Sequence, residues 1–195
     1  MGITRRYRGL PEQNLASYDF YDLATGTGYK TFLGIDTNTG AATKVYRLIT
    51  NAYYPASGYT GYAAAIDVDF DLALEVPMTI DGNLFFNVVY GYDGAAADRT
   101  ANVKFYHVNA AGTETQIGAS WSLTIGGADT ANTITSGLAN IPLTRFKAGE
   151  TFRMSITADD AAATVRIYSD PMNRTSLGGH TLTTSQLKVL LPIKL

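Results

Sequence analysis

Cysteine is absent from the 195 residues of this chain. Disulfide bonds, thiolate nucleophiles and thiolate metal sites are therefore excluded. Charged residues are sparse at 16%, and the net charge is only −2, so no general attraction to nucleic acid or to an anionic membrane surface is expected. No apolar run approaches the roughly 20 residues that a membrane-spanning helix needs.

Targeting signals are missing from the first residues as well. Arg5 and Arg6 are adjacent, but no apolar stretch follows them as it would in an export signal. The N-myristoylation pattern fails because Arg6 stands where Ser or Thr is required. We therefore expect a protein that is kept in the cytoplasm of the cell that makes it, or released when that cell breaks.

Helical periodicity is also missing, whereas five stretches alternate apolar and polar residues with a period of two. The clearest are residues 68–76 and 117–125. Successive side chains of a strand point to opposite faces, so each stretch has one apolar row and one wettable row. This pattern is typical of half-buried antiparallel sheet.

Turn residues divide the chain into short strands at regular intervals. The breaks include Asp81-Gly82, Gly126-Gly127 and Ala148-Gly149. We expect strands at 44–50, 65–76, 83–92, 101–108, 115–125, 132–138, 151–158, 163–169 and 186–195. The spacing predicts an all-β fold, an antiparallel two-sheet β-sandwich of jelly-roll type. Pro192 places the last strand at a sheet edge or at a bulge, because proline lacks the N–H of a central ladder.

The predicted core consists of the apolar rows of these strands. Trp121 is the only tryptophan, and its place in an apolar row predicts burial. The expected core residues are Phe70, Leu72, Leu74, Phe86, Val88, Phe105, Trp121, Leu123, Phe152, Met154, Ile156 and Ile167.

The composition changes near residue 43, which divides the chain into an extended N-terminal arm (1–43) and a β-sandwich domain (44–195). No period persists in the arm, and one short strand is expected at 29–34. Nine of the thirteen tyrosines lie in the first 62 residues, and tyrosine is favoured at protein interfaces. Two interpretations remain open: an interface arm, or a segment that covers the domain's own sheet. The candidate assembly residues are Arg5, Arg6, Tyr7, Arg8, Tyr18, Phe20, Tyr21, Leu23, Tyr29 and Phe32.

An acidic run, Asp67, Asp69 and Asp71, is the only pattern that points to a metal. An EF-hand loop would need Gly at the position of Leu72 and Glu at that of Met78, so that motif fails. On a strand the three carboxylates share one face and repel one another. A solvated sheet face is the favoured interpretation, and a cation site with a second strand or subunit is the alternative.

Catalytic motifs are not found. His107 and His180 have no nucleophile or metal-ligand motif beside them, and Asp159-Asp160 fits a turn better than a paired-carboxylate site. Gly26-Thr-Gly28 with Lys30-Thr31 lacks the spacing of a phosphate-binding loop. We therefore predict no enzyme activity, no catalytic residue, no metal and no cofactor.

Segments at both ends carry a resemblance. Arg5-Arg-Tyr-Arg-Gly9, the run at 18–34, Ile167-Tyr-Ser-Asp-Pro-Met-Asn-Arg174 and Leu187-Lys-Val-Leu-Leu-Pro-Ile-Lys194 resemble segments of small virion structural proteins of tailed bacteriophages. Residues 146–154 are similar to the strand-turn-strand entry of many jelly rolls. The resemblance implies a multimeric capsid decoration or auxiliary protein without catalysis.

Three functions are compared on this basis. As a virion structural protein, assembled in the host cytoplasm, the chain would contact itself, with a trimer expected by analogy, and other virion proteins such as the major capsid protein. It would bind neither nucleic acid nor membrane directly. As a carbohydrate- or receptor-binding module it would stack sugars on exposed aromatic rings, against which the expected burial of Trp121 counts. An enzyme is the third and least supported function.

Overall fold

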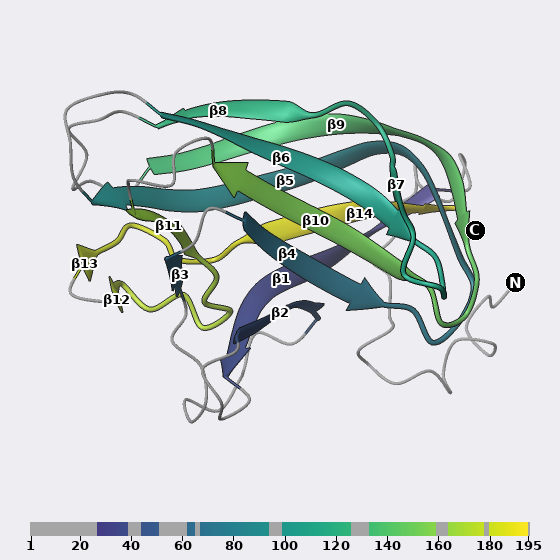
Figure 1. The fold of residues 1–195 in the computed structure, drawn as a ribbon, viewed down its shortest axis with the longest axis horizontal. Coiled ribbons are helices and arrows are strands. Elements are labelled where there is room, and N and C mark those ends of the chain that lie inside the picture. Colours follow the sequence, from purple (N-terminus) through teal and green to yellow (C-terminus); the bar gives the residue numbers. More distant parts are fainter. Residues whose placement is uncertain are drawn as a thin grey trace, which may run out of the picture.

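The computed structural model describes residues 27–38, 44–50, 62–64, 67–93, 99–125, 133–158, 164–177 and 180–194. All regular elements in these ranges are strands, and the ranges contain no helix (Figure 1). The strands are β1 (Thr27–Asn38), β2 (Lys44–Ile49), β3 (Tyr62–Ala64), β4 (Asp67–Ala73), β5 (Met78–Asp93), β6 (Arg99–Val108), β7 (Glu114–Gln116), β8 (Trp121–Ile125), β9 (Thr133–Phe146), β10 (Thr151–Ala158), β11 (Thr164–Tyr168), β12 (Ser176–Leu177), β13 (His180–Thr181) and β14 (Lys188–Lys194). Consequently, a membrane-crossing helix is not found in this part of the chain.

Twelve strands form one sheet, in the order β3-β11-β5-β14-β1-β2-β4-β10-β6-β7, with β9 on β5 and β8 on β6. The remaining pair, β12 and β13, forms a small separate sheet. The all-β prediction is confirmed. The expectation of purely antiparallel pairing is wrong, because β2 and β4 pair in parallel through Arg47 and Asp71. The chain passes through β3 between these two strands, and so it can enter both in the same direction.

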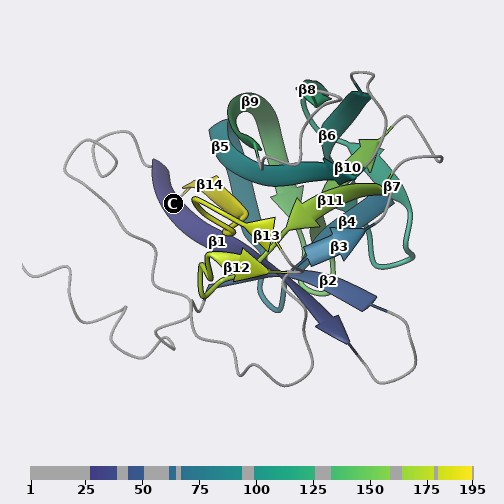
Figure 2. The same ribbon diagram turned by 90° about the vertical axis from the view of Figure 1, so that its left-hand side faces the viewer.

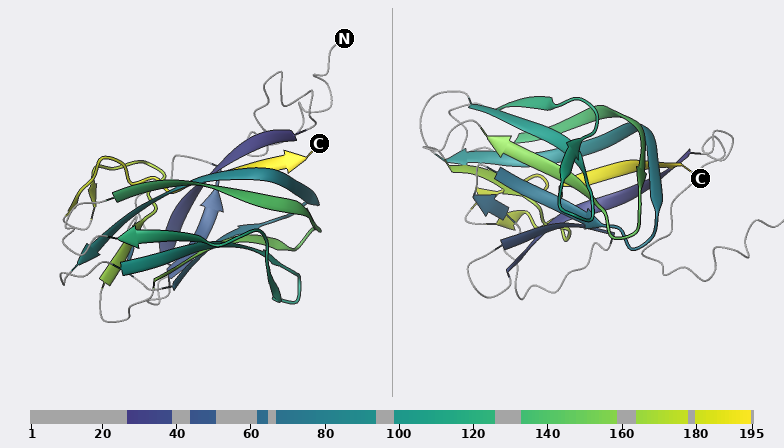
Figure 3. Two further views of the ribbon diagram at one scale, coloured as in Figure 1. Left: turned by 90° about the horizontal axis from the view of Figure 1, so that it is seen from above. Right: turned by 45° about the vertical axis from the view of Figure 1, so that its right-hand side comes forward.

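The sheet bends so that two of its parts face each other across one core. We call β1, β5, β9 and β14 the β5 wall, and β4, β6 and β10 the β10 wall (Figure 3). Aromatic rings join them: Phe86 meets Phe105 edge-on at 5.5 Å between centroids, and Phe146 meets Phe152 at 6.4 Å. The outer face of each wall is therefore the surface available for function.

Most of the predicted core is confirmed. Leu72 and Trp121 are only partly buried but pack against the core, and the side chain of Leu123 lies outside the described residues. The other nine are buried: Phe70, Leu74, Phe86, Val88, Phe105, Phe152, Met154, Ile156 and Ile167.

The predicted turn at Asp81-Gly82 is wrong, because β5 runs through it as one strand of 16 residues. The glycine is used differently: Gly82 has a φ of 112°, and the register against β9 shifts between Ile80 and Gly82. A positive φ inside a strand is the geometry of a bulge, which needs the same residue types as a turn.

The last strand lies in the middle of the sheet and not at its edge. β14 pairs with β1 on one side and with β5 on the other. Its register against β5 shifts between Leu190 and Ile193, so Pro192 lies where the ladder is irregular. Of the two predicted places for this proline, the bulge is therefore confirmed and the edge is wrong.

Among the described residues, the first strand of the sheet begins at Thr27, within the segment expected to be an arm. β1 pairs with β14 and then with β2, and its Phe32 and Ile35 are 4% and 0% exposed. The predicted strand at 29–34 is confirmed and is longer than expected. Residues 1–26 lie outside the described residues, so an arm in that part of the chain stays a prediction.

The segment between β11 and β14 folds against the outer face of β5 and β11 (Figure 2). Tyr168 and Val89 pack there with Leu177 and Leu182 in a second small cluster. Asp170 is fully buried and accepts the backbone N–H of Met172 at 3.0 Å and of Arg174 at 2.8 Å. This segment covers one end of the β5 wall, and the described residues leave the rest of its outer face open.

Candidate functional site

The open part of the β5 wall is apolar where an outer face is usually polar. Phe86 points into the core, so its neighbours Phe85 and Asn87 point outward. Residues opposite each other in antiparallel strands share a face, and Phe85 lies opposite both Leu138 of β9 and Leu190 of β14. Phe85 is 44% exposed and Leu138 is 46% exposed. Large exposed apolar side chains that adjoin one another mark interaction sites more often than isolated ones do.

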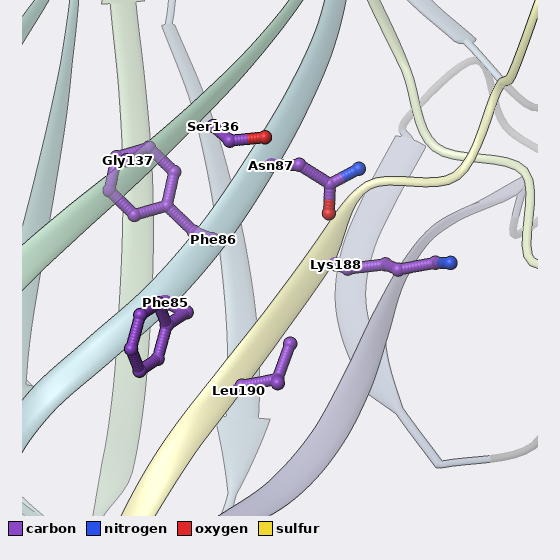
Figure 4. Close-up of a pocket in the computed structure, with 7 residues that line it drawn as sticks. All are labelled: Phe85, Phe86, Asn87, Ser136, Gly137, Lys188 and Leu190. Atoms are coloured by element: carbon purple, nitrogen blue, oxygen red, sulfur yellow. The ribbon is translucent and has the colours of Figure 1, made fainter.

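A groove of about 390 Å³ runs along this face. Phe85 and Leu190 form its apolar end, while Asn87 and Ser136 bring an amide and a hydroxyl to the other end (Figure 4). The lining consists of Phe85, Phe86, Asn87, Ser136, Gly137, Lys188 and Leu190.

Tyr29 extends the apolar surface to the next strand. Its ring lies 5.7 Å from that of Phe85, between centroids, in a tilted arrangement. We call Tyr29, Phe85, Leu138 and Leu190 the outer patch; it spans β1, β14, β5 and β9. Four adjacent strands thus contribute one apolar side chain each to a continuous surface.

Lys188 supplies the charge at the groove. It lies opposite Asn87 in the β5–β14 ladder, and it has no carboxylate partner among the residues that the structure describes. The amide of Asn87 donates a hydrogen bond to the carbonyl oxygen of Gln186 at 3.1 Å, which fixes the polar end of the groove to the segment before β14. The groove therefore offers apolar contact together with one ammonium group, which suits a ligand that is both apolar and anionic.

The predicted assembly residues fall into three groups. Tyr29 belongs to the outer patch, whereas Phe32, on the opposite face of β1, is part of the core and unavailable for surface contact. The remaining eight lie outside the described residues: Arg5, Arg6, Tyr7, Arg8, Tyr18, Phe20, Tyr21 and Leu23.

His107 and Glu150 form a pair near the turn between β9 and β10. Nε2 of His107 lies 2.7 Å from Oε2 of Glu150, which also accepts the backbone N–H of Lys147 at 2.7 Å. The Lys147 hydrogen bond, and after it the one with His107, lowers the pKa of Glu150. The ring of His107 packs on Phe146 at 4.6 Å between centroids. These contacts anchor the turn to β6, which is a structural role; the side chain of His180 lies outside the described part of the chain.

The acidic run lies on the outer face of the β10 wall, as predicted, but a cation already occupies that face. Arg153 of β10 contacts Asp69 at 3.0 Å and Asp71 at 2.7 Å, and it also pairs with Glu114. The hydrogen bond with Asp71 raises the pKa of Arg153. Within the described ranges, no group of three or more ligating side chains is placed to hold a metal. The expected mutual repulsion is therefore offset by attraction to Arg153.

Trp121 does not present a flat ring for stacking. It packs against the core and meets Phe86 edge-on, with 5.8 Å between ring centroids and an interplanar angle of 87°. Phe85 of the outer patch is more exposed, at 44%, than this partly buried tryptophan.

The groove was missed in the sequence analysis although one signal was present. Both β5 and β14 contain consecutive apolar residues, Phe85-Phe86 and Leu190-Leu191, at positions where alternation predicts one inward and one outward. An apolar residue in the outward row indicates that both faces of the strand make apolar contacts. The sequence does not show, however, that these strands are neighbours.

No family model and no curated protein matches this chain. Among solved structures, it is similar to a CocE/NonD family hydrolase from Staphylococcus aureus, with a TM-score of 0.55 and 11% identity over 87% of this chain and 37% of that one. An alpha-amino acid ester hydrolase gives 0.55 and 11%, over 83% of this chain and 36% of that one. An aminopeptidase from the marine sediment archaeon Thaumarchaeota archaeon gives 0.50 and 9%, over 87% and 33%. The chain thus spans about a third of the length of each, and the likeness concerns the fold alone.

Proposed function

We propose that this chain is a non-enzymatic structural protein of a virus particle, a capsid decoration protein of jelly-roll sandwich type that associates through its outer patch. The observation that carries the proposal is the exposure of Phe85 and Leu138, at 44% and 46%, on a continuous sheet face. The resemblance of the terminal segments to virion structural proteins is the reason for proposing a virus particle.

The free energy of burying apolar surface favours an outer patch that is covered by a partner over one that stays in water. Burying apolar surface contributes about 25 cal/mol per Å², so a solvent-exposed outer patch gives up stabilisation that a partner would recover. Aromatic side chains with a polar surround are typical of the centre of a protein–protein interface. The opposite wall carries Asp67, Asp69, Asp71 and Arg153, which suits a face that stays in water.

Sedimentation velocity of the full chain tests self-association. We expect a multimer whose population grows with protein concentration, and a monomer when Phe85 and Leu138 are both replaced by Ser. Val76→Ser is the matched control, because Val76 is 65% exposed but lies outside the outer patch. A wild-type chain that remains monomeric at about 100 μM would contradict the proposal, since a specific interface binds more tightly than that.

The kind of particle needs a separate measurement. Mass spectrometry of purified virus particles, with electron microscopy of the same preparation, should find the chain in stoichiometric amounts on the shell. Its absence from intact particles would contradict the virion role while leaving self-association untouched.

A second candidate is a β-module that accompanies the catalytic part of a larger hydrolase. It is favoured by the likeness to about a third of the length of three hydrolytic enzymes. Such a module would bind its catalytic partner through the same outer patch. Hydrolysis of a chromogenic ester or of an aminoacyl anilide by the purified chain would overturn both candidates, because neither assigns catalysis to this chain.

A further inference from the structure

We infer that the groove on the β5 wall binds residues 18–23 of a second copy of this chain. The inference rests on the proposed function, because it names the occupant of the surface through which the copies would associate. The segment reads Tyr-Asp-Phe-Tyr-Asp-Leu and contains aromatic and apolar groups, two carboxylates and no cation.

The charges of groove and segment are complementary. Lys188 is half-buried at the groove and has no carboxylate partner in the described part of the chain. Asp19 and Asp22 are the acids of the segment. An ammonium beside apolar side chains favours a carboxylate that arrives together with apolar groups, because both sets of contacts then exclude water.

The spacing also matches. Lys188 and Leu190 are two residues apart on the same face of β14, which places them about 6.6–7 Å from each other. Phe20 and Asp22 have the same separation in an extended chain and also point to one side. A segment lying along β14 therefore sets Phe20 on Leu190 and Phe85 while Asp22 reaches Lys188.

Contact between two outer patches fits less well. A twofold arrangement with its axis at the groove brings Lys188 of one copy toward Lys188 of the other, and like charges at an interface oppose binding. The segment is also close in sequence to the outer patch, the surface through which two copies would associate. It precedes Thr27, where β1 begins, and Tyr29 of β1 belongs to the outer patch. Three residues separate Leu23 from Thr27, and the four Cα–Cα steps between them would span at most about 14 Å.

Two variants of the full chain separate the partners. The groove variant combines Phe85→Ser with Lys188→Glu, and the segment variant combines Phe20→Ser with Asp22→Lys. Each alone should self-associate at least about 30-fold more weakly in sedimentation velocity, as loss of an aromatic anchor predicts. An equimolar mixture should regain a dimer, because an intact groove on one copy then meets an intact segment on the other. Circular dichroism checks that both variants remain folded.

Charge reversal supplies a second, independent test. Lys188→Glu alone should weaken association about threefold to tenfold, and adding Asp22→Lys to it should restore association to within about threefold of wild type. Val76→Ser, exposed and remote from the groove, should leave association unchanged.

The outcomes distinguish this inference from the proposed function. If the groove variant dissociates the multimer and the segment variant does not, the surface is an interface with another occupant, and the inference is wrong. If a fluorescent peptide of residues 16–25 binds the segment variant but the mixture stays monomeric, each segment occupies its own chain's groove, which also overturns it. A wild-type chain that never self-associates contradicts the proposed function itself.

Discussion

Gly137 is the position where a single added methyl group tests the packing beneath the groove most directly. An ideal Cβ built on Gly137 would lie 2.3 Å from Cζ and 2.6 Å from Cε1 of Phe86. The ring would have to move by about 1 Å to reach ordinary van der Waals contact. Phe105 and Trp121 block that movement, with their ring centroids 5.5 and 5.8 Å from that of Phe86.

Two opposing contributions determine how much Gly137→Ala changes the free energy of unfolding. Replacing glycine inside a strand by alanine ordinarily stabilises by about 0.5–1 kcal/mol, because the unfolded chain loses less entropy. Overpacking a closed core costs about 1–3 kcal/mol. We expect a net loss of about 1–2 kcal/mol, which lowers the melting temperature of a chain of this size by about 2–8 °C.

Urea unfolding followed by tryptophan fluorescence is the assay, since Trp121 is the only tryptophan and contacts Phe86 directly. Phe86→Leu removes the ring that causes the clash, so in that background Gly137→Ala should be neutral or stabilising by up to about 1 kcal/mol. If Gly137→Ala stabilises the wild-type chain, the ring of Phe86 does not lie over Gly137, and the packing described beneath the groove is wrong.

Three further changes test other parts of the structure. The hydrogen bonds that Glu150 accepts lower its pKa below the ordinary 4.5. They therefore stabilise the folded state fully above about pH 4.5, and this stabilisation is lost as the pH falls through the lower pKa of the folded state. In the Glu150→Gln variant the melting temperature should therefore fall less steeply as the pH is lowered. An unchanged slope would mean that other groups cause the loss of stability at acid pH. Asp71→Asn should destabilise by about 0.5–1 kcal/mol, and less at 1 M salt, because it weakens the pair with Arg153; a stabilising effect would restore the picture of mutual repulsion. Trp121→Ala should cost about 3 kcal/mol, seen as a melting point about 6–12 °C lower, and an unchanged melting point would mean an exposed ring and favour sugar binding.

Some strand positions could be predicted from the sequence because alternation and turn residues are local properties, but the strand expected at 115–125 is wrong: it is two strands, β7 and β8, with residues 117–120 between them. The segment 151–158 was predicted with its observed bounds, and 44–50 to within one residue. The turn at Asp81-Gly82 was not distinguishable from a bulge, because both require a positive φ and therefore the same residues. The neighbours of each strand were beyond reach, since pairing depends on contacts between distant parts of the chain.

The candidate site was hidden for the same reason. Phe85, Leu138 and Leu190 adjoin only because β9, β5 and β14 are neighbours in the sheet. Arg153 likewise neutralises Asp71 from 82 residues away, so the acidic run alone looked repulsive. Burial of individual residues was easier to predict, because the apolar row of a strand faces the core whichever strands are its neighbours.

The central place of β14 has a consequence for how the chain acquires its structure during synthesis. β1 and β5 are translated early, but both pair with β14, whose residues 188–194 follow those of every other described strand. Until these residues leave the ribosome, the facing edges of β1 and β5 expose unpaired backbone groups. The sheet can close only afterwards, through contacts of long sequence separation, which makes folding slow. A ribosome stalled before residue 188 should therefore hold a protease-sensitive chain, and the same chain should become resistant once β14 has emerged.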